Sequence, residues 1–353
     1  MSININTSSR RIRAVAVSLV AFAMAGAVLI DSGPPAFADE GAVTSADAAA
    51  HLVDAATVAT AAPVAVDTDT VAAAAADSSV KDIVVDAGAS EASLPAQADA
   101  PVVLRSEGGE SVGVKLPVST ARPRGTDLGP VVYQDKGKGV DAVVTVMDGS
   151  VQIAIVIDSR RDPLSYPYEV LVPDGGSVVR DGATGGVVIK DAAGTPIAGF
   201  AAPWAKDARG RSVPTWYEIK GNVVTQVVAP GPGATYPIVA DPWFGKDLIS
   251  SASWVRYTEG WTLQVTPTQW ARSNAGSYAV GAAGWLELKA KYQNRGLNTN
   301  LTGMQDQYIC HQQLVAVRDR NKATWNLDEW RPSVGYVQTV NSYCNPGGNK
   351  WFD

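Results

Sequence analysis

The chain has 353 residues, which is enough for about two domains of ordinary size. Its 29 Lys and Arg residues against 35 Asp and Glu residues give a formal net charge of −6. Proteins that bind nucleic acid usually carry a strongly basic face, so this balance argues against nucleic acid as a partner.

The first residues have the pattern of an export signal. Arg10, Arg11 and Arg13 precede an apolar stretch over residues 14–30, and residues 36–38 read Ala-Phe-Ala, the small-residue pattern before a cleavage site. The arginine pair also resembles a twin-arginine signal. A membrane anchor is the alternative, but the apolar stretch is short for crossing a bilayer. We therefore expect residues 1–38 to be a cleaved signal peptide, which leaves a secreted protein without a membrane span.

Residues 39–126 contain no aromatic side chain and are rich in Ala, Val, Asp and Thr. A segment without large side chains buries too little surface to offset the entropy lost on ordering. We expect a disordered linker here, with an alanine-rich helix over parts of it as the alternative.

From residue 127 to residue 242, short apolar runs alternate with turn residues. The runs over 140–147 and 151–157 flank Asp148-Gly149-Ser150, which predicts a β-hairpin. Similar runs and turns recur along the segment. The pattern predicts an all-β domain, a meander or a sandwich.

Three pieces of this domain resemble a β-rich region of exported actinobacterial proteins. They are residues 202–210 (Ala-Pro-Trp-Ala-Lys-Asp-Ala-Arg-Gly), residues 213–215 (Val-Pro-Thr) and residues 236–242, which end in Ala-Asp-Pro. In those proteins the region precedes varied C-terminal domains. The resemblance implies a scaffold that presents a C-terminal domain, and it brings no catalytic residues.

Residues 243–353 carry eight of the ten tryptophans, both cysteines and His311. Alternating side chains over 253–257 and 261–265 predict a hairpin at the start of this segment. Apolar residues spaced three and four apart predict a helix over 284–293.

A second helix is predicted from Thr302 onward, because Thr302 and Gln305 have the spacing of a capping box. Residues 332–343 fit a helix or a strand. The fold class expected for the chain is therefore two domains, an all-β meander or sandwich followed by a small, disulfide-stapled α+β domain.

Cys310 and Cys344 are the only cysteines of the chain. In an oxidising compartment, two cysteines allow one intramolecular bridge. Two cysteines and one histidine at irregular spacing do not match a zinc site, and a reactive Cys310-His311 pair is the remaining alternative. We expect a disulfide.

Five short pieces of residues 243–353 resemble a domain of unknown function, number 2599 of that series, which occurs in secreted actinobacterial proteins. The pieces are Met304-Gln305-Asp306-Gln307, Cys310-His311, Trp325-Asn326-Leu327, Trp330-Arg331-Pro332 and Cys344-Asn345-Pro346. The resemblance implies an exported protein with the paired-cysteine fold, and it implies no established activity.

His311 is the candidate proton shuttle near neutral pH. Asp306 and Glu329 are carboxylates near it in sequence, and such a set could serve the hydrolysis of a phosphodiester or a glycosidic bond. We favour the structural alternative, a half-buried histidine bonded to a backbone carbonyl. Asp328 and Glu329 are adjacent, so their side chains point apart and make a poor glycosidase pair. Residues 326–329 are more simply the start of a helix with an acidic first turn.

Trp254, Trp261 and Trp330 are the candidate ligand-binding residues, because exposed tryptophans can stack on sugar rings. Most of the other tryptophans must form the core of so small a domain. No phosphate loop, H-E-x-x-H motif or G-x-S-x-G elbow occurs in the chain. We therefore expect no cofactor and no metal.

These patterns lead to one function hypothesis and one alternative. The first is a secreted, envelope-associated protein without enzymatic activity, which binds a cell-wall polysaccharide or a surface protein. The alternative is an exported antibacterial effector or hydrolase that acts through the C-terminal domain around His311.

Overall fold

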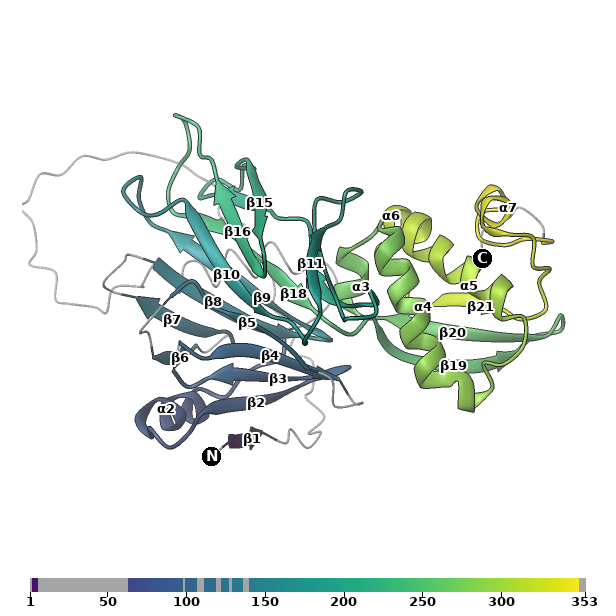
Figure 1. The fold of residues 1–353 in the computed structure, drawn as a ribbon, viewed down its shortest axis with the longest axis horizontal. Coiled ribbons are helices and arrows are strands. Elements are labelled where there is room, and N and C mark those ends of the chain that lie inside the picture. The colour runs from purple at the N-terminus through teal and green to yellow at the C-terminus, as the bar shows by residue number, and fades with distance from the viewer. Residues whose placement is uncertain are drawn as a thin grey trace, which may run out of the picture.

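The computed structural model describes residues 2–5, 63–97, 99–106, 111–118, 122–126, 129–135 and 140–348, with the backbone alone for residues 2–5. The fold is mostly β-sheet. Two large sheets lie together at one end, and a small sheet with most of the helices lies at the other (Figure 1). The predicted signal peptide falls outside the described residues, apart from a short strand over its first residues.

The first large sheet has the strand order β1-β2-β3-β4-β5-β10-β16-β15. Its strands are β1 (Ser2–Ile5), β2 (Asp82–Ala87), β3 (Ser90–Pro95), β4 (Pro101–Ser106), β5 (Ser111–Lys115), β10 (Ser165–Leu171), β16 (Val223–Val228) and β15 (Thr215–Lys220). The pair β1–β2 is parallel and all the others are antiparallel.

The second large sheet has the order β11-β12-β13-β18-β9-β8-β7-β6, with β14 and β17 joined to it through β9. Its strands are β6 (Pro123–Gly125), β7 (Val131–Asp135), β8 (Val140–Met147), β9 (Ser150–Ile157), β11 (Ser177–Arg180), β12 (Val187–Lys190), β13 (Pro196–Phe200), β14 (Ala205–Asp207), β17 (Ile238–Ala240) and β18 (Trp243–Gly245). The predicted hairpin over 140–157 is confirmed, because Met147 pairs with Ser150 across Asp148-Gly149.

The linker prediction is wrong for the described part of residues 63–126. This segment forms helix α2 (Thr68–Ala76) and strands β2 to β6. Ile83, Leu94 and Leu104 are completely buried in one cluster with side chains of the second large sheet. Valine, leucine and alanine suffice here because the aromatic side chains that complete this core, such as Tyr133, come from elsewhere in the chain. Residues 39–62 lie outside the described residues.

The third sheet has the order β19-β20-β21, with β19 (Ile249–Arg256), β20 (Trp261–Pro267) and β21 (Trp325–Asp328). The β19–β20 pair confirms the predicted hairpin. Leu263, Trp325 and Leu327 lie on one face of the sheet and are fully buried in a second hydrophobic cluster. That cluster also takes in Met147 and Trp243 from the second large sheet, so the two parts of the molecule pack directly against each other.

Most helices of this end lie between β20 and β21 in the chain, and one follows β21. They are α3 (Gln269–Ser273), α4 (Tyr278–Tyr292), the 3₁₀ turn η1 (Gln293–Arg295), α5 (Leu301–Cys310), the π-helical turn η2 (His311–Val315), α6 (Ala316–Arg318) and α7 (Tyr336–Asn341). No helix within the described residues is both long and apolar enough to span a bilayer.

Helices α4 and α5 confirm the two predicted helices, and α7 resolves the ambiguous segment as a helix. The predicted capping box is wrong. Asn300 precedes α5 in a left-handed conformation, and its amide instead donates to the carbonyl oxygens of Glu329 and Arg331. The predicted helix start at residues 326–329 is also wrong, because β20 takes this segment as its partner strand β21.

Candidate functional site

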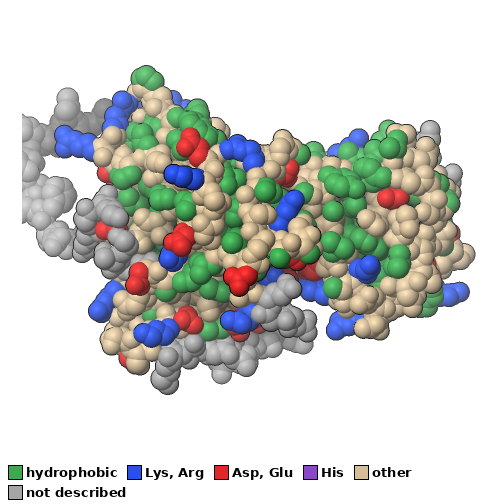
Figure 2. Space-filling model, viewed as in Figure 1, with side chains coloured by type: hydrophobic (Ala, Val, Ile, Leu, Met, Phe, Trp, Pro, Cys, Tyr) green, Lys and Arg blue, Asp and Glu red, His purple; other side chains and the backbone are tan. Residues whose placement is uncertain are grey.

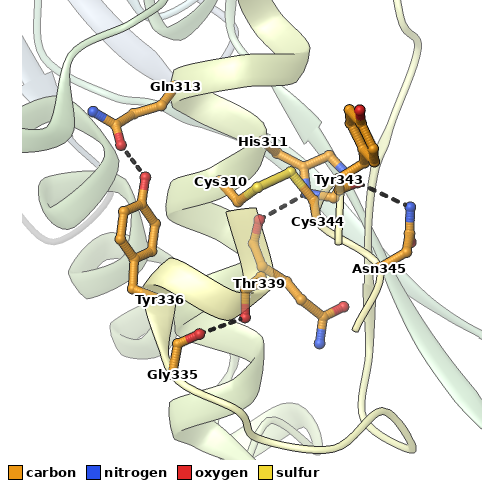
Figure 3. The surroundings of a disulfide bond; sticks show 10 residues. Cys310, His311, Gln313, Gly335, Tyr336, Thr339, Tyr343, Cys344 and Asn345 are labelled. Carbon is orange, nitrogen blue, oxygen red and sulfur yellow. Dashed lines mark hydrogen bonds between the residues drawn. A yellow bond between two sulfur atoms is a disulfide. The ribbon is translucent and has the colours of Figure 1, made fainter. Parts of the chain in front are cut away.

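The disulfide confirms the cysteine prediction. Cys310, the last residue of α5, bonds to Cys344 after α7 across 34 residues of chain. Figure 3 shows how further contacts hold the same segment: Cys344 N–H donates to the Thr339 carbonyl at 2.9 Å, and the Tyr336 hydroxyl contacts the side chain of Gln313. The disulfide therefore fixes the α7 segment onto α5, and the Tyr336–Gln313 hydrogen bond fixes it onto η2.

His311 is buried, with 4% of its surface exposed. Its Nδ1 lies 2.8 Å from the Gln307 carbonyl oxygen, one helical turn earlier, and its ring stacks on Trp325. Burial lowers the pKa of this imidazole to about 4, against the opposite effect of the Gln307 carbonyl. The side chain is neutral at physiological pH and lies in the core, which suits packing better than proton transfer to a ligand.

The structure does not bring Asp306 and Glu329 together with His311. Asp306 is half-buried on α5, and burial raises the pKa of its carboxyl. Glu329 accepts a hydrogen bond from the Thr299 hydroxyl at 2.7 Å. The carboxylate that raises the pKa of His311 is Asp328. Asp328 itself accepts a hydrogen bond from the Thr262 hydroxyl at 2.5 Å and forms an ion pair with Arg331. Among the described residues, neither predicted carboxylate forms an ion pair or a hydrogen bond with this histidine.

The three candidate tryptophans differ in exposure. Trp254 is half-buried, packs against the second cluster and donates from Nε1 to the Arg295 carbonyl at 2.8 Å. Trp330 is also half-buried. Trp261 has 40% of its surface exposed. Of the three, Trp261 can offer the most ring area to a ligand.

Trp261 and Trp330 lie at the same end of the β19–β20 hairpin. The Glu329 N–H donates to the Trp261 carbonyl at 3.1 Å, and a Cβ on Gly260 would come within 2.8 Å of Trp330 Cβ, so the indole packs on the turn. Glycine at 260 leaves room for that ring. Two guanidinium groups lie over the indoles, Arg256 at 5.5 Å from the Trp261 ring and Arg331 at 4.4 Å from the Trp330 ring. We refer to Arg256, Trp261, Trp330 and Arg331 as the hairpin edge.

A cleft of about 1310 Å³ lies between the large sheets and helix α4. One wall is apolar and includes Ile197, Trp270 and Leu286. Acidic and basic side chains lie on the surface between the two ends of the molecule (Figure 2). The polar wall contains Asp247, Glu287 and Lys291, and sequence reasoning did not single out these three.

Asp247, Glu287 and Lys291 form one charged cluster. Lys291 Nζ lies 2.7 Å from Glu287 Oε1 and 3.5 Å from Asp247 Oδ1. Glu287 also accepts hydrogen bonds from the backbone N–H groups of Leu248 and Ile249, at 2.7 and 3.1 Å. Burial raises the pKa of the Glu287 carboxyl, although the Lys291 charge acts to lower it. Burial alone would lower the pKa of Lys291, but the Glu287 and Asp247 carboxylates outweigh it and raise that pKa.

Asp247 links the cluster to the first large sheet. It accepts hydrogen bonds from the hydroxyls of Ser106, at 3.0 Å, and Ser90. Both carboxylates are thus engaged by internal donors, which is the arrangement of a structural junction rather than of a catalytic pair. In the sequence, only the four-residue spacing of Glu287 and Lys291 on a helix indicated that these two side chains would meet. No pattern near Asp247 indicated that it would join them.

Residues 249–347 match a protein family described as "Protein of unknown function (DUF2599)". A protein of Mycobacterium bovis and one of Mycobacterium tuberculosis, both named as uncharacterized proteins, are each 31% identical to this chain over 118 residues. The match covers 33% of this chain and 77% of each relative. No solved structure matches the chain. The chain therefore belongs to the family of these mycobacterial proteins, and its matched DUF2599 region begins at strand β19 and ends after the second cysteine of the disulfide.

Proposed function

We propose that this protein is an exported, envelope-associated binding protein without catalytic activity, and that it holds a cell-wall polysaccharide at the hairpin edge. The observation that carries the proposal is the Trp261 indole, exposed at the end of the β19–β20 hairpin with the Arg256 guanidinium over its ring. A flat aromatic face matches the apolar face of a sugar ring, and a guanidinium can donate to sugar hydroxyl, carboxylate or phosphate oxygens.

The side chains around the hairpin edge fit the same use. Tyr257, in the hairpin turn, is 45% exposed, and its hydroxyl accepts a hydrogen bond from Gln264 at 3.0 Å. Packing of Trp330 on Gly260 holds the turn in place. A preorganised surface of this kind loses little conformational entropy when it binds a ligand.

The state of the titratable groups supports binding over catalysis. His311 is buried and neutral, and the carboxylates of Asp247, Glu287 and Asp328 are all engaged by internal donors. The effector alternative needs a proton shuttle that reaches its substrate. His311 does not supply one in this arrangement.

The organisation that goes with this function is a presenting domain followed by a binding domain. We place the boundary between β18, which pairs within the second large sheet, and β19, where the family match begins. The predicted boundary after residue 242 would cut β18 from its sheet. Export through residues 1–38 would bring the protein to the envelope.

Binding to purified cell wall tests the proposal. Wild-type protein and the Trp261→Ala and Arg256→Ala variants are incubated with wall material and sedimented. We expect wild type to sediment and both variants to lose most of the binding. Trp216→Ala is the matched control, because Trp216 is also 40% exposed but lies in β15 of the first large sheet. Equal sedimentation of wild type and Trp261→Ala would refute the assignment.

A further inference from the structure

A second set of buried polar groups lies within the part of the molecule built from the two large sheets, where two distant pieces of the chain meet. The Trp204 N–H donates to Asp241 Oδ1 at 2.8 Å, and the Asp241 N–H donates to the Trp204 carbonyl at 3.2 Å. Trp204 lies in the Ala-Pro-Trp piece and Asp241 in the Ala-Asp-Pro piece of the sequence. The structure therefore joins these two pieces at one carboxyl group.

The second oxygen of this carboxyl, Asp241 Oδ2, has no hydrogen-bond partner within the described part of the chain, and the same holds for three side-chain oxygens near it: Tyr168 Oη, Tyr217 Oη and Gln226 Oε1. All four residues are completely buried. An unbonded buried polar atom costs about 1–3 kcal/mol, so four together in one core require a physical explanation.

The four groups are neighbours. Gln226 Nε2 lies 3.4 Å from Asp241 Oδ1, and Tyr217 is the direct partner of Gln226 across β15 and β16. Burial raises the pKa of the Tyr168 and Tyr217 phenols well above the usual value, and the nearby Asp241 carboxylate raises it further. Phe200 packs against both phenol rings, at 6.4 Å from the Tyr168 ring and 6.0 Å from the Tyr217 ring between centroids.

The chemistry of the set limits what can satisfy it. Burial raises the pKa of Asp241 to about 8, against the effect of the Trp204 N–H and the Gln226 amide, so this carboxyl keeps its proton at neutral pH. The two phenols and the carboxylic acid then each carry an O–H donor, and the Gln226 carbonyl is an acceptor. An occupant must both donate and accept; a metal cation would leave the O–H donors unbonded.

We propose that Tyr168, Tyr217, Gln226 and Asp241 form a buried water-binding site, in which ordered water bridges the two phenols, the amide and the carboxylic acid. Buried water of this kind typically makes about three hydrogen bonds to protein groups that would otherwise lack partners. The water in this site would join β10, β15 and β16 of the first large sheet to the segment that links β17 to β18.

A high-resolution crystal structure of the intact protein tests the site directly. We expect spherical density within hydrogen-bonding distance of Asp241 Oδ2 and at least one phenol oxygen. Absence of density there would overturn the proposal. Anomalous signal at the same position after a rubidium soak would also overturn it, because it would identify a cation.

Substitution of one phenol separates a hydrated site from a dry one. If water bridges the site, Tyr217→Phe removes a bonded hydroxyl and lowers the Tm by several degrees. If the hydroxyl has no partner, its removal leaves the Tm unchanged or raises it, and the proposal fails. Tyr133→Phe is the control, since the buried Tyr133 hydroxyl donates to the Pro95 carbonyl at 2.8 Å and its loss should lower the Tm.

Discussion

At the scale of single residues, His311 illustrates how packing determines the state of a titratable group. Its ring stacks on Trp325 and its Nδ1 contacts the Gln307 carbonyl, both within the core beside the disulfide. The charged form of an imidazole loses its hydration there, which is why burial lowers the pKa to about 4. The residue that looked most reactive in the sequence is an element of the core.

The lowered pKa of His311 predicts a loss of stability in acid. The unfolded chain takes up a proton near pH 6.5, whereas the folded state resists protonation down to about pH 4. The free energy of unfolding should therefore fall as the pH drops from about 6.5 to 4, by up to about 3 kcal/mol from this group. Urea unfolding across this range measures the effect. His311→Gln should flatten the dependence, and an unchanged pH profile in that variant would contradict the assignment.

At the scale of elements, helix α4 covers the free edge of the third sheet. β19 is an edge strand, and α4 supplies side-chain partners for backbone N–H groups along it: Tyr292 accepts from Ala252 at 2.7 Å, and Glu287 accepts from Ile249 and from Leu248, which directly precedes the strand. An uncovered edge strand invites pairing with other chains. The helix therefore protects this edge while it joins the two parts of the molecule.

Removal of the Glu287 carboxylate should destabilise the fold strongly. Glu287→Ala leaves two backbone N–H groups without their acceptor and leaves Lys291 with Asp247 as its remaining carboxylate partner. Removal of one side of a buried ion pair typically costs about 3–5 kcal/mol. Urea unfolding measures the change. Glu218→Ala, at an exposed position of β15, is the control and should shift the unfolding free energy by less than about 0.5 kcal/mol. A similar small shift for Glu287→Ala would show that the cluster contributes little.

At the scale of the whole molecule, residues 63–126 are part of the sheets rather than a spacer. Strands β2 to β5 form half of the first large sheet, and β5 pairs with β10 far along the chain. At the junction with the third sheet, the Trp270 ring packs directly on Gly245, where a Cβ would come within 2.2 Å of it. The parts of the molecule thus depend on long-range contacts for their shape.

A truncated chain tests this dependence. Protein that begins at residue 127 lacks β2 to β6 and leaves the inner faces of β10 and β9 partly uncovered, so it should be insoluble or unfold without a cooperative transition. Protein that begins at residue 63 keeps those strands and should be soluble. It should unfold cooperatively on heating, in one or two sharp transitions. Circular dichroism and thermal melting distinguish the two proteins. A well-folded chain from residue 127 would restore the linker interpretation.

The sequence by itself determined the features that depend on neighbours along the chain. The Asp148-Gly149 turn specified the β8–β9 hairpin, three- and four-residue spacing specified α4, and a single possible pairing specified the disulfide between Cys310 and Cys344. Each of these signals acts over a turn of backbone or follows from counting one kind of residue.

Tertiary structure alone decided the features that depend on partners far away in sequence. Strands β2 to β5 have too few large side chains to order by themselves, and only the opposing sheet buries them. Residues 326–329 have the composition of a helix start, but β20 offers them a ladder of hydrogen bonds instead. The contact of Asp247 with Lys291 and the approach of Trp204 to Asp241 likewise join residues dozens of positions apart, and no local pattern encodes which of many buried polar groups will meet.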